Sequence, residues 1–150
     1  MATLGARPFP PGYRGAGVLL HVTSLPSRHG IGDLGPSAFT WIDRLHEAGQ
    51  RWWQGLPVGP TGWGDSPYQS LSSFAGNGLL ISPDCLVEEG LLRASDCGGF
   101  FPSLVVDYET VVPYKQRMLD EAWRRFGAGI RPDLRRLPPS SLTPAGAASA

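Results

Sequence analysis

Residues 17–60 decide the fold of this chain, and they read GVLLHVTSLPSRHGIGDLGPSAFTWIDRLHEAGQRWWQGLPVGP. Residues 17–22 form a short, continuously apolar run, which is typical of a strand buried on both faces within a parallel sheet. Residues 51–58, RWWQGLPV, read as a second strand, which ends at a Gly-Pro pair. The two runs therefore predict two strands of one sheet.

Residues 36–48 predict the helix that joins these strands. Pro36 suits the first position of a helix, and Gly49 suits the position just after its end. Apolar side chains form one stripe along this helix, and the charged side chains take the remaining surface. The stripe consists of Ala38, Phe39, Trp41, Ile42, Leu45 and Ala48. The order strand, helix, strand is a βαβ unit, so we expect parallel strands and a right-handed crossover.

Two more helices are expected farther along. A short one starts at Ser82-Pro83-Asp84 and ends at Gly90, because Ser, Pro and Asp are favoured in that order at a helix start. A longer one opens at Pro113 and carries an apolar face of Tyr114, Met118, Leu119, Ala122 and Phe126. Residues 104–108 fit either a strand or an extended loop.

Three regions follow from the composition along the chain. Residues 1–15 are expected to be an irregular leader, because three prolines interrupt regular structure. Residues 16–126 hold the expected helices and strands. Residues 127–150 are rich in Pro, Ser and Ala, and we expect a disordered tail there.

Composition and charge exclude several classes of function. The chain has 150 residues, and its 13 basic residues balance 13 acidic ones, so no field attracts a nucleic acid. No apolar run reaches the roughly 18 residues of a membrane span, and the leader lacks the apolar segment of a secretory signal. Cys85 and Cys97 fit ordinary thiols in a reducing cytoplasm. A complete (β/α)₈ barrel needs about 250 residues and does not fit.

The long loop at residues 59–78 is the strongest candidate for a functional site, since loops beyond about 12–15 residues are often functional. Its first part, residues 59–70, reads GPTGWGDSPYQS and places two large aromatic residues among glycines, hydroxyls, an amide and an acid. Flat aromatic faces beside hydrogen-bonding groups suit a sugar, whose C–H faces stack and whose hydroxyls need partners. An equally weighted alternative is a turn-rich connection with structural aromatics.

Other groups of residues give weaker evidence for a functional site. Trp52 and Trp53 are adjacent on a strand, so their rings face opposite ways, and core packing is favoured over ligand contact. His21 is expected to be a buried histidine with satisfied hydrogen bonds, whereas His29 and His46 fit a loop and a helix surface. No phosphate-binding glycine fingerprint, nucleophile elbow, CxxC pair or metal-ligand spacing occurs, so no metal site is expected.

Several ordered blocks resemble one known family. They are GVLLHVTSLPS at 17–27, GIGDLG at 30–35, AGQR at 48–51, WQ at 53–54, LPVGPTG at 56–62, GDSPYQS at 64–70 and FAGN at 74–77. Together they resemble the N-terminal portion of the 4-alpha-glucanotransferases, which are the amylomaltases or disproportionating enzymes of glycoside hydrolase family 77. The resemblance covers roughly residues 16–126.

This resemblance implies a fold and an activity. The fold would be α/β, the N-terminal part of a (β/α)₈ TIM barrel: its first βαβ unit plus part of an inserted helical subdomain. The activity would move a segment of a 1,4-alpha-glucan to the 4-hydroxyl of an acceptor glucose or glucan by retaining double displacement. The expected partners are maltooligosaccharides and 1,4-alpha-glucans, with no cofactor or metal.

The resemblance also implies roles for residues of the loop. Asp65, Ser66, Tyr68 and Gln69 match the motif that lines the donor side of the cleft, with Tyr68 stacking on a sugar and Ser66 hydrogen-bonding nearby. Trp63 replaces a Tyr that some members use in a second glucan-binding groove. The catalytic acids of the family lie on later barrel strands, so no catalytic residue is assigned here. We therefore expect the 150-residue chain to be inactive by itself.

Some features depart from the family. Gly55 stands where members carry a branched aliphatic residue, Gly78 follows Asn77 where Pro is usual, and the tail after Gly127 resembles nothing in the family. These departures suggest a fragment, a frameshifted reading or a truncated gene. The alternative function is therefore a non-catalytic remnant or glucan-binding module. A Pro-rich interaction protein is a third reading, which only the leader and the tail support.

Overall fold

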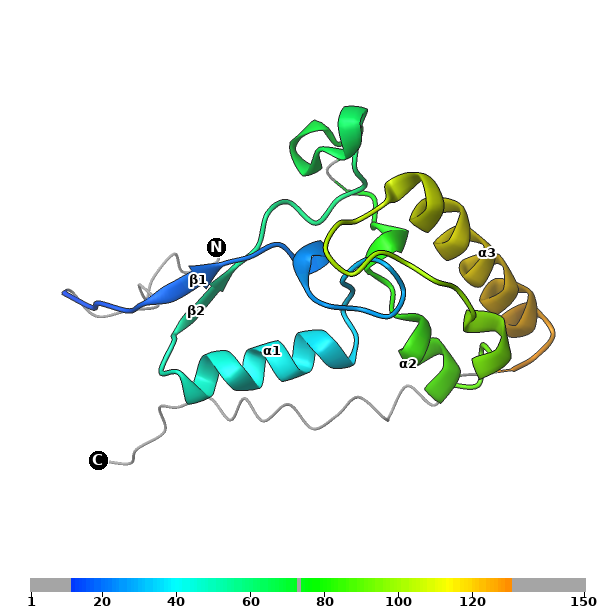
Figure 1. Cartoon of the computed structure of the whole chain (residues 1–150), viewed down its shortest axis with the longest axis horizontal. Coiled ribbons are helices and arrows are strands. Elements are labelled where there is room, and N and C mark those ends of the chain that lie inside the picture. Colours follow the sequence, from blue (N-terminus) through cyan, green and yellow to red (C-terminus); the bar gives the residue numbers. More distant parts are fainter. Residues whose placement is uncertain (1–11, 73, 131–150) are drawn as a thin grey trace, which may run out of the picture.

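The computed structural model describes residues 12–72 and 74–130 (Figure 1). The helices and strands are β1 (Gly17–Leu19), α1 (Pro36–Glu47), β2 (Trp52–Gln54), α2 (Pro83–Glu88) and α3 (Tyr108–Gly127), with short 3₁₀ turns between them. The expected leader through residue 11 and the expected tail from residue 131 lie outside the described residues.

A small parallel sheet joins β1 and β2, with Gly17 opposite Trp52 and Leu19 opposite Gln54. The backbone N–H of Leu20 extends the pairing by donating to the carbonyl of Gln54 at 3.0 Å. With α1 as the connection, this arrangement confirms the predicted βαβ unit and its parallel strands.

Both strands are shorter than predicted. β1 ends at Leu19 because the backbone turns into a 3₁₀ helix at Val22–Ser24, in which the N–H of Ser24 donates to the carbonyl of His21 at 3.0 Å. Gly17 and Leu19 are exposed, so the expectation of a strand buried on both faces is wrong for β1. β2 stops before Gly55, which weakens a strand because it has no side chain to pack.

α1 occupies the predicted residues. Pro36 is its first residue, and Gly49 follows its end with φ +70°. The N–H of Gly49 donates to the carbonyl of His46 at 2.9 Å, and that of Gln50 donates to the carbonyl of Leu45 at 2.9 Å. This is a Schellman motif, in which a left-handed glycine satisfies carbonyls at the helix end.

One core lies between the sheet and α1. Its buried members are Val22, Leu25, Ala38 and Leu80, with Leu20, Trp41 and Trp53 packed against them. The indole of Trp53 donates to the carbonyl of Leu20 at 2.7 Å, whereas Trp52 is 43% exposed. Core packing is therefore confirmed for Trp53, and the two adjacent rings lie in different environments.

A second core lies between α2, α3 and the 3₁₀ turn Ala94–Cys97. Its buried members are Leu91, Leu92, Tyr114, Met118 and Ala122. Figure 1 shows α2 and α3 together on the side away from the strands, with the loop after β2 projecting beyond both. The apolar face of α3 predicted from periodicity is confirmed at Tyr114, Met118 and Ala122, which are buried in this core.

The start of α3 differs from the prediction. The helix begins at Tyr108, and Pro113 lies inside it. The Asp107 carboxylate accepts from the N–H of Thr110 at 3.4 Å and from its hydroxyl at 2.7 Å, which caps the first turn. This cap begins the helix upstream of Pro113, whose missing N–H costs one hydrogen bond near the helix start.

Candidate functional site

Residues 61–70, here called the aromatic loop, fold into two consecutive 3₁₀ turns, Trp63–Asp65 and Pro67–Gln69. The N–H of Gly62 donates to the carbonyl of Ser66 at 3.2 Å, and the N–H of Asp65 donates to the carbonyl of Gly62 at 3.1 Å. The five residues predicted as sugar contacts are thereby gathered within one compact turn.

Local backbone requirements explain why this loop needs its glycines. Gly64 and Asp65 both have positive φ, 64° and 56°, and Asp is among the few non-glycine residues that adopt this conformation readily. A Cβ on Gly62 would lie 1.8 Å from the carbonyl oxygen of Gln69, so only glycine permits this close approach. In the sequence, the spacing of the glycines is the feature that indicates this tight turn.

The base of the aromatic loop is closed by side chains. The Asn77 amide donates to the carbonyl of Gly59 at 3.0 Å, and the Ser70 hydroxyl donates to the carbonyl of Ser72 at 2.7 Å. Gly59 also lies close to Ser70, because a Cβ there would be 3.1 Å from the Ser70 hydroxyl oxygen. These contacts hold the two ends of the loop together, so its tip has a defined shape.

The tip presents two aromatic rings to solvent. Trp63 is 87% exposed and Tyr68 is 71% exposed, while Asp65 and Ser66 are half-buried and Gln69 is exposed. The Ser66 oxygen accepts from the N–H of Tyr68 at 3.3 Å, which leaves the hydroxyl proton available to another acceptor. Both rings are therefore accessible from solvent.

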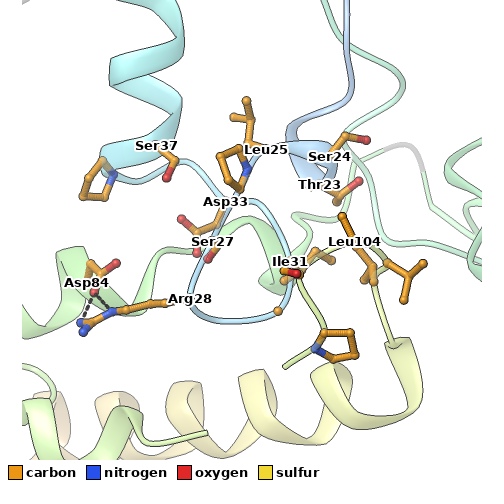
Figure 2. Close-up of a pocket in the computed structure, with 17 residues that line it drawn as sticks. Thr23, Ser24, Leu25, Ser27, Arg28, Ile31, Asp33, Ser37, Asp84 and Leu104 are labelled. Carbon is orange, nitrogen blue, oxygen red and sulfur yellow. Dashed lines mark hydrogen bonds and ion pairs between the residues drawn. The ribbon is translucent and has the colours of Figure 1, made fainter. Parts of the chain in front are cut away.

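A hollow lies outside the aromatic loop. It is a cleft of ≈ 800 Å³ lined by the segment between β1 and α1, by Asp84 at the start of α2 and by residues 102–106. In Figure 2, Ser37, Asp33 and Ser27 follow one another from α1 toward Asp84, while Thr23 and Leu104 lie together on the other side. No residue of the aromatic loop lines this cleft.

A buried ion pair forms one support of the cleft. The Lys115 ammonium on α3 donates to the Asp33 carboxylate at 2.8 Å and to the carbonyl of Ile81 at 2.8 Å. Lys115 is 1% exposed, and burial lowers its pKa while the Asp33 charge opposes that shift. The pair therefore fixes the glycine-rich segment after β1 against α3.

A second network supports the same segment through Asp84. Arg28 Nε donates to Asp84 Oδ1 at 3.0 Å, and His29 Nε2 lies 3.2 Å from the same oxygen. Burial opposes ionisation of Asp84, but the hydrogen bonds from Arg28 and His29 outweigh it, and the pKa of Asp84 is lowered. This carboxylate therefore stays ionised near neutral pH.

His29 connects Asp84 to α3. Its Nδ1 lies 2.8 Å from the Tyr114 hydroxyl, and burial lowers the pKa of His29 although Asp84 partly opposes the shift. Burial also raises the pKa of Tyr114 to about 12, so its hydroxyl stays protonated and can give its single proton either to Nδ1 or to the carbonyl of Cys97, which lies at 3.1 Å. A buried imidazole thus lies between a carboxylate and a phenol.

Two expectations about histidines are wrong. His29 is almost fully buried instead of lying on a loop surface, and the Nδ1 atom of buried His21 has no hydrogen-bond partner among the described residues. His46 is exposed on α1, as expected. A signal for this buried network was present: Lys115 is a charge within the apolar stripe of α3, which indicates a buried partner.

The described residues contain neither a metal-binding cluster nor a helix that could span a membrane. Within residues 12–72 and 74–130, no group of three or more His, Cys, Asp or Glu side chains could hold a metal ion. None of the helices described combines the length and the apolar character that crossing a membrane requires. Cys85 and Cys97 are free thiols.

The sequence matches one protein family. A model of the family described as 4-alpha-glucanotransferase matches residues 20–136, which extends beyond residue 126, where the resemblance was expected to end. The 4-alpha-glucanotransferase of Synechocystis sp. is 50% identical over 119 residues, covering 78% of this chain and 24% of that protein. That of Thermus thermophilus is 49% identical over 122 residues, covering 81% and 24%.

The structure matches the same group. Amylomaltase from Streptococcus agalactiae, solved in complex with acarbose, superposes with a TM-score of 0.72 at 40% identity, covering 77% of this chain and 24% of that one. The chain therefore spans about a quarter of the length of the relatives it matches.

Proposed function

Because this chain belongs to the 4-alpha-glucanotransferase family, glycoside hydrolase family 77, we propose that it forms the first βαβ unit of a (β/α)₈ barrel, with α2 and α3 in an inserted helical subdomain. The parallel pairing of β1 and β2 supports this assignment, since parallel strands joined by a helix are the repeating unit of that barrel. The cytoplasm is the compartment we propose, in keeping with two free thiols.

The proposed activity of the whole protein is transfer of a 1,4-alpha-glucan segment to the 4-hydroxyl of an acceptor glucose or glucan. In a retaining double displacement, a carboxylate attacks the anomeric carbon while a carboxylic acid protonates the leaving oxygen. The acceptor hydroxyl then displaces the carboxylate and returns its proton to that second group. We expect these acids on later barrel strands, and we propose that the present residues contribute substrate binding.

The observation that carries this proposal is the exposure of Trp63 and Tyr68 at the tip of a closed loop. A pyranose ring has an apolar C–H face that stacks on an aromatic ring, and its hydroxyls require hydrogen-bond partners beside that ring. The aromatic loop offers both within a few residues, and the ordered base keeps the rings from collapsing onto the protein.

Each polar residue of the loop has a role that its surroundings allow. The Ser66 hydroxyl can donate to a sugar oxygen while it accepts from the N–H of Tyr68. The exposed amide of Gln69 can both donate and accept, and the Asp65 carboxylate can accept from sugar hydroxyls. We propose that Tyr68 stacks on the donor glucan and that Trp63 extends the same surface.

A glucan-binding module without turnover is the second candidate, because the same loop would serve it. Incubating the 150-residue chain with maltotriose distinguishes the two: disproportionation would yield glucose and longer maltodextrins, whereas a binding unit leaves maltotriose unchanged. We expect no turnover by this chain alone. Glucose release that persists after repurification would show instead that these residues supply catalytic acids.

Binding itself is tested by calorimetry with maltotriose on wild type, Tyr68→Ala and Phe100→Ala. Phe100 is a matched control because it is an aromatic side chain that is 95% exposed outside the aromatic loop. Stacking contributions of about 0.5–1.5 kcal/mol predict roughly two- to tenfold weaker binding for Tyr68→Ala. Equal affinity of all three proteins would remove the loop from the proposed function.

A further inference from the structure

We infer that the cleft beneath α1 is a second binding site, separate from the aromatic loop, for a short neutral saccharide. The sugar class is taken from the proposed function, and to that extent the inference rests on it. The cleft shares no lining residue with the aromatic loop, and its volume of ≈ 800 Å³ falls within the roughly 300–1,000 Å³ of small-molecule sites.

Thr23 is the first residue that points to a ligand. It is 7% exposed, it lines the cleft, and its hydroxyl forms no hydrogen bond with another described residue. Its carbonyl accepts from the N–H of Gly32 at 3.1 Å, and a Cβ on Gly32 would lie 2.1 Å from the carbonyl oxygen of Val22. The backbone therefore holds a nearly buried, unpaired hydroxyl in the wall of an open cleft.

The charges of the cleft are already balanced. Asp33 pairs with Lys115 through Oδ2, and Asp84 pairs with Arg28 through Oδ1. The other oxygen of each carboxylate forms no hydrogen bond with a described residue and can accept one. A charged ligand would meet no uncompensated partner here, whereas a neutral ligand rich in hydroxyl donors would satisfy both oxygens.

The remaining wall is apolar. Leu25 and Ile31 are buried lining residues, and Leu104 and Val105 are exposed ones. Aliphatic side chains facing hydroxyl and carboxylate groups match the two kinds of surface on a sugar, its C–H faces and its hydroxyls. The hydroxyl of Ser37 at the start of α1, which is likewise unpaired, adds a further donor and acceptor.

Site-resolved NMR on the 150-residue chain separates the two sites. The reporters are the δ-methyl of Ile31 in the cleft, the δ-methyl of Ile42 on α1 as a control, and the indole N–H of Trp63 in the aromatic loop. With maltotriose as the probe, we expect the Ile31 signal to shift in a saturable way and the Ile42 signal to stay in place. Tyr68→Ala should leave the Ile31 titration unchanged.

Variants in the cleft should give the opposite pattern. Thr23→Val keeps the shape of the side chain, and loss of its hydroxyl should weaken the Ile31 titration roughly three- to tenfold while the Trp63 titration is retained. Ser37→Ala is the second variant, with a smaller loss of the same kind.

Three results would overturn the inference: no saturable shift at Ile31, an Ile31 shift that disappears with Tyr68→Ala, or equal titrations for wild type, Thr23→Val and Ser37→Ala. A collapsed methyl spectrum of the chain would overturn it too, since the cleft would not exist there. A shift at Ile31 without one at Trp63 would keep the cleft and remove the aromatic loop from the proposed function.

Discussion

Lys115 Nζ and Asp33 Oδ2 lie 2.8 Å apart although 82 positions separate the two residues in the sequence. Both side chains are buried, and the ammonium also donates to the carbonyl of Ile81. This contact joins the segment after β1, the turn before α2 and the first half of α3. Together with the contact between His29 and Tyr114, it connects the segment after β1 to α3.

Lys115→Met should therefore destabilise the chain strongly. Removing one partner leaves the Asp33 carboxylate buried without its counter-charge, and such losses cost about 3–5 kcal/mol. Urea denaturation followed by circular dichroism measures the change in the free energy of unfolding. The double variant Asp33→Asn/Lys115→Met is the control, because it removes both charges.

We expect the double variant to be more stable than Lys115→Met alone, since no isolated buried charge remains. The single variant Asp33→Asn completes the comparison. If the destabilisation of the double variant equalled the sum of the losses in Asp33→Asn and Lys115→Met, the two charges would act independently, against the ion pair described here.

Gly62→Ala should disturb the aromatic loop without unfolding the chain. An added Cβ would lie 1.8 Å from the Gln69 carbonyl oxygen, so the two turns must separate. Gly76→Ala is a matched control in the same long connection, because a Cβ there meets nothing within 4 Å. The measurement is maltotriose affinity, which should fall by roughly the two- to tenfold expected for Tyr68→Ala in the first variant only.

Retained affinity in Gly62→Ala would mean that sugar binding does not depend on the turn geometry. A loss of affinity in Gly76→Ala of the same size would point to a general effect of alanine in this connection.

Alanine substitutions at Gly30 and Gly49 distinguish the stability cost of backbone strain from that of steric overlap. Both have positive φ, 76° and 70°, but a Cβ on Gly30 would lie 2.5 Å from the Phe101 ring and one on Gly49 meets nothing within 4 Å. Gly49→Ala should cost about 1–2 kcal/mol for the left-handed conformation. Gly30→Ala should cost about 1–3 kcal/mol more, because the core must also move.

Thermal or urea unfolding of both variants gives the comparison. Equal losses would mean that Phe101 moves aside freely, and the packing of residues near 101 against α3 would then be looser than described.

The features that could be predicted from the sequence are those encoded by neighbouring residues. The βαβ unit was predictable because Pro36 and Gly49 mark the ends of α1 locally, and the apolar runs beside them mark the strands. The aromatic loop was proposed as a site from its length and composition, which are local too.

The errors concern contacts between distant residues. Burial of His29 depends on Asp84 and Tyr114, and no local pattern around His29 encodes those partners. The sequence predicts the start of α3 too late, because Pro113 suits a first helical residue, whereas Asp107 provides the cap. The cleft could not be predicted, since three separate segments line it.

The histidines should make the chain less stable in acid. Burial lowers the pKa of His29 and of His21 below the ordinary value of 6.5, so the folded state binds fewer protons than the unfolded state as pH falls past that value. Their contribution is therefore complete above about pH 6.5 and is lost as the pH falls toward their folded-state pKa values. Asp84, with a pKa below its ordinary 3.8, adds a further loss only below that pH.

Melting temperatures from about pH 8 to about pH 5 measure this effect. His29→Gln keeps polar groups for Asp84 and Tyr114 but does not titrate, so its melting temperature should fall less steeply over this range than that of wild type. His46→Gln, on the exposed surface of α1, should keep the wild-type slope. If His29→Gln kept that slope as well, the titration of His29 could not be the cause, and the acid sensitivity over this range would belong to His21.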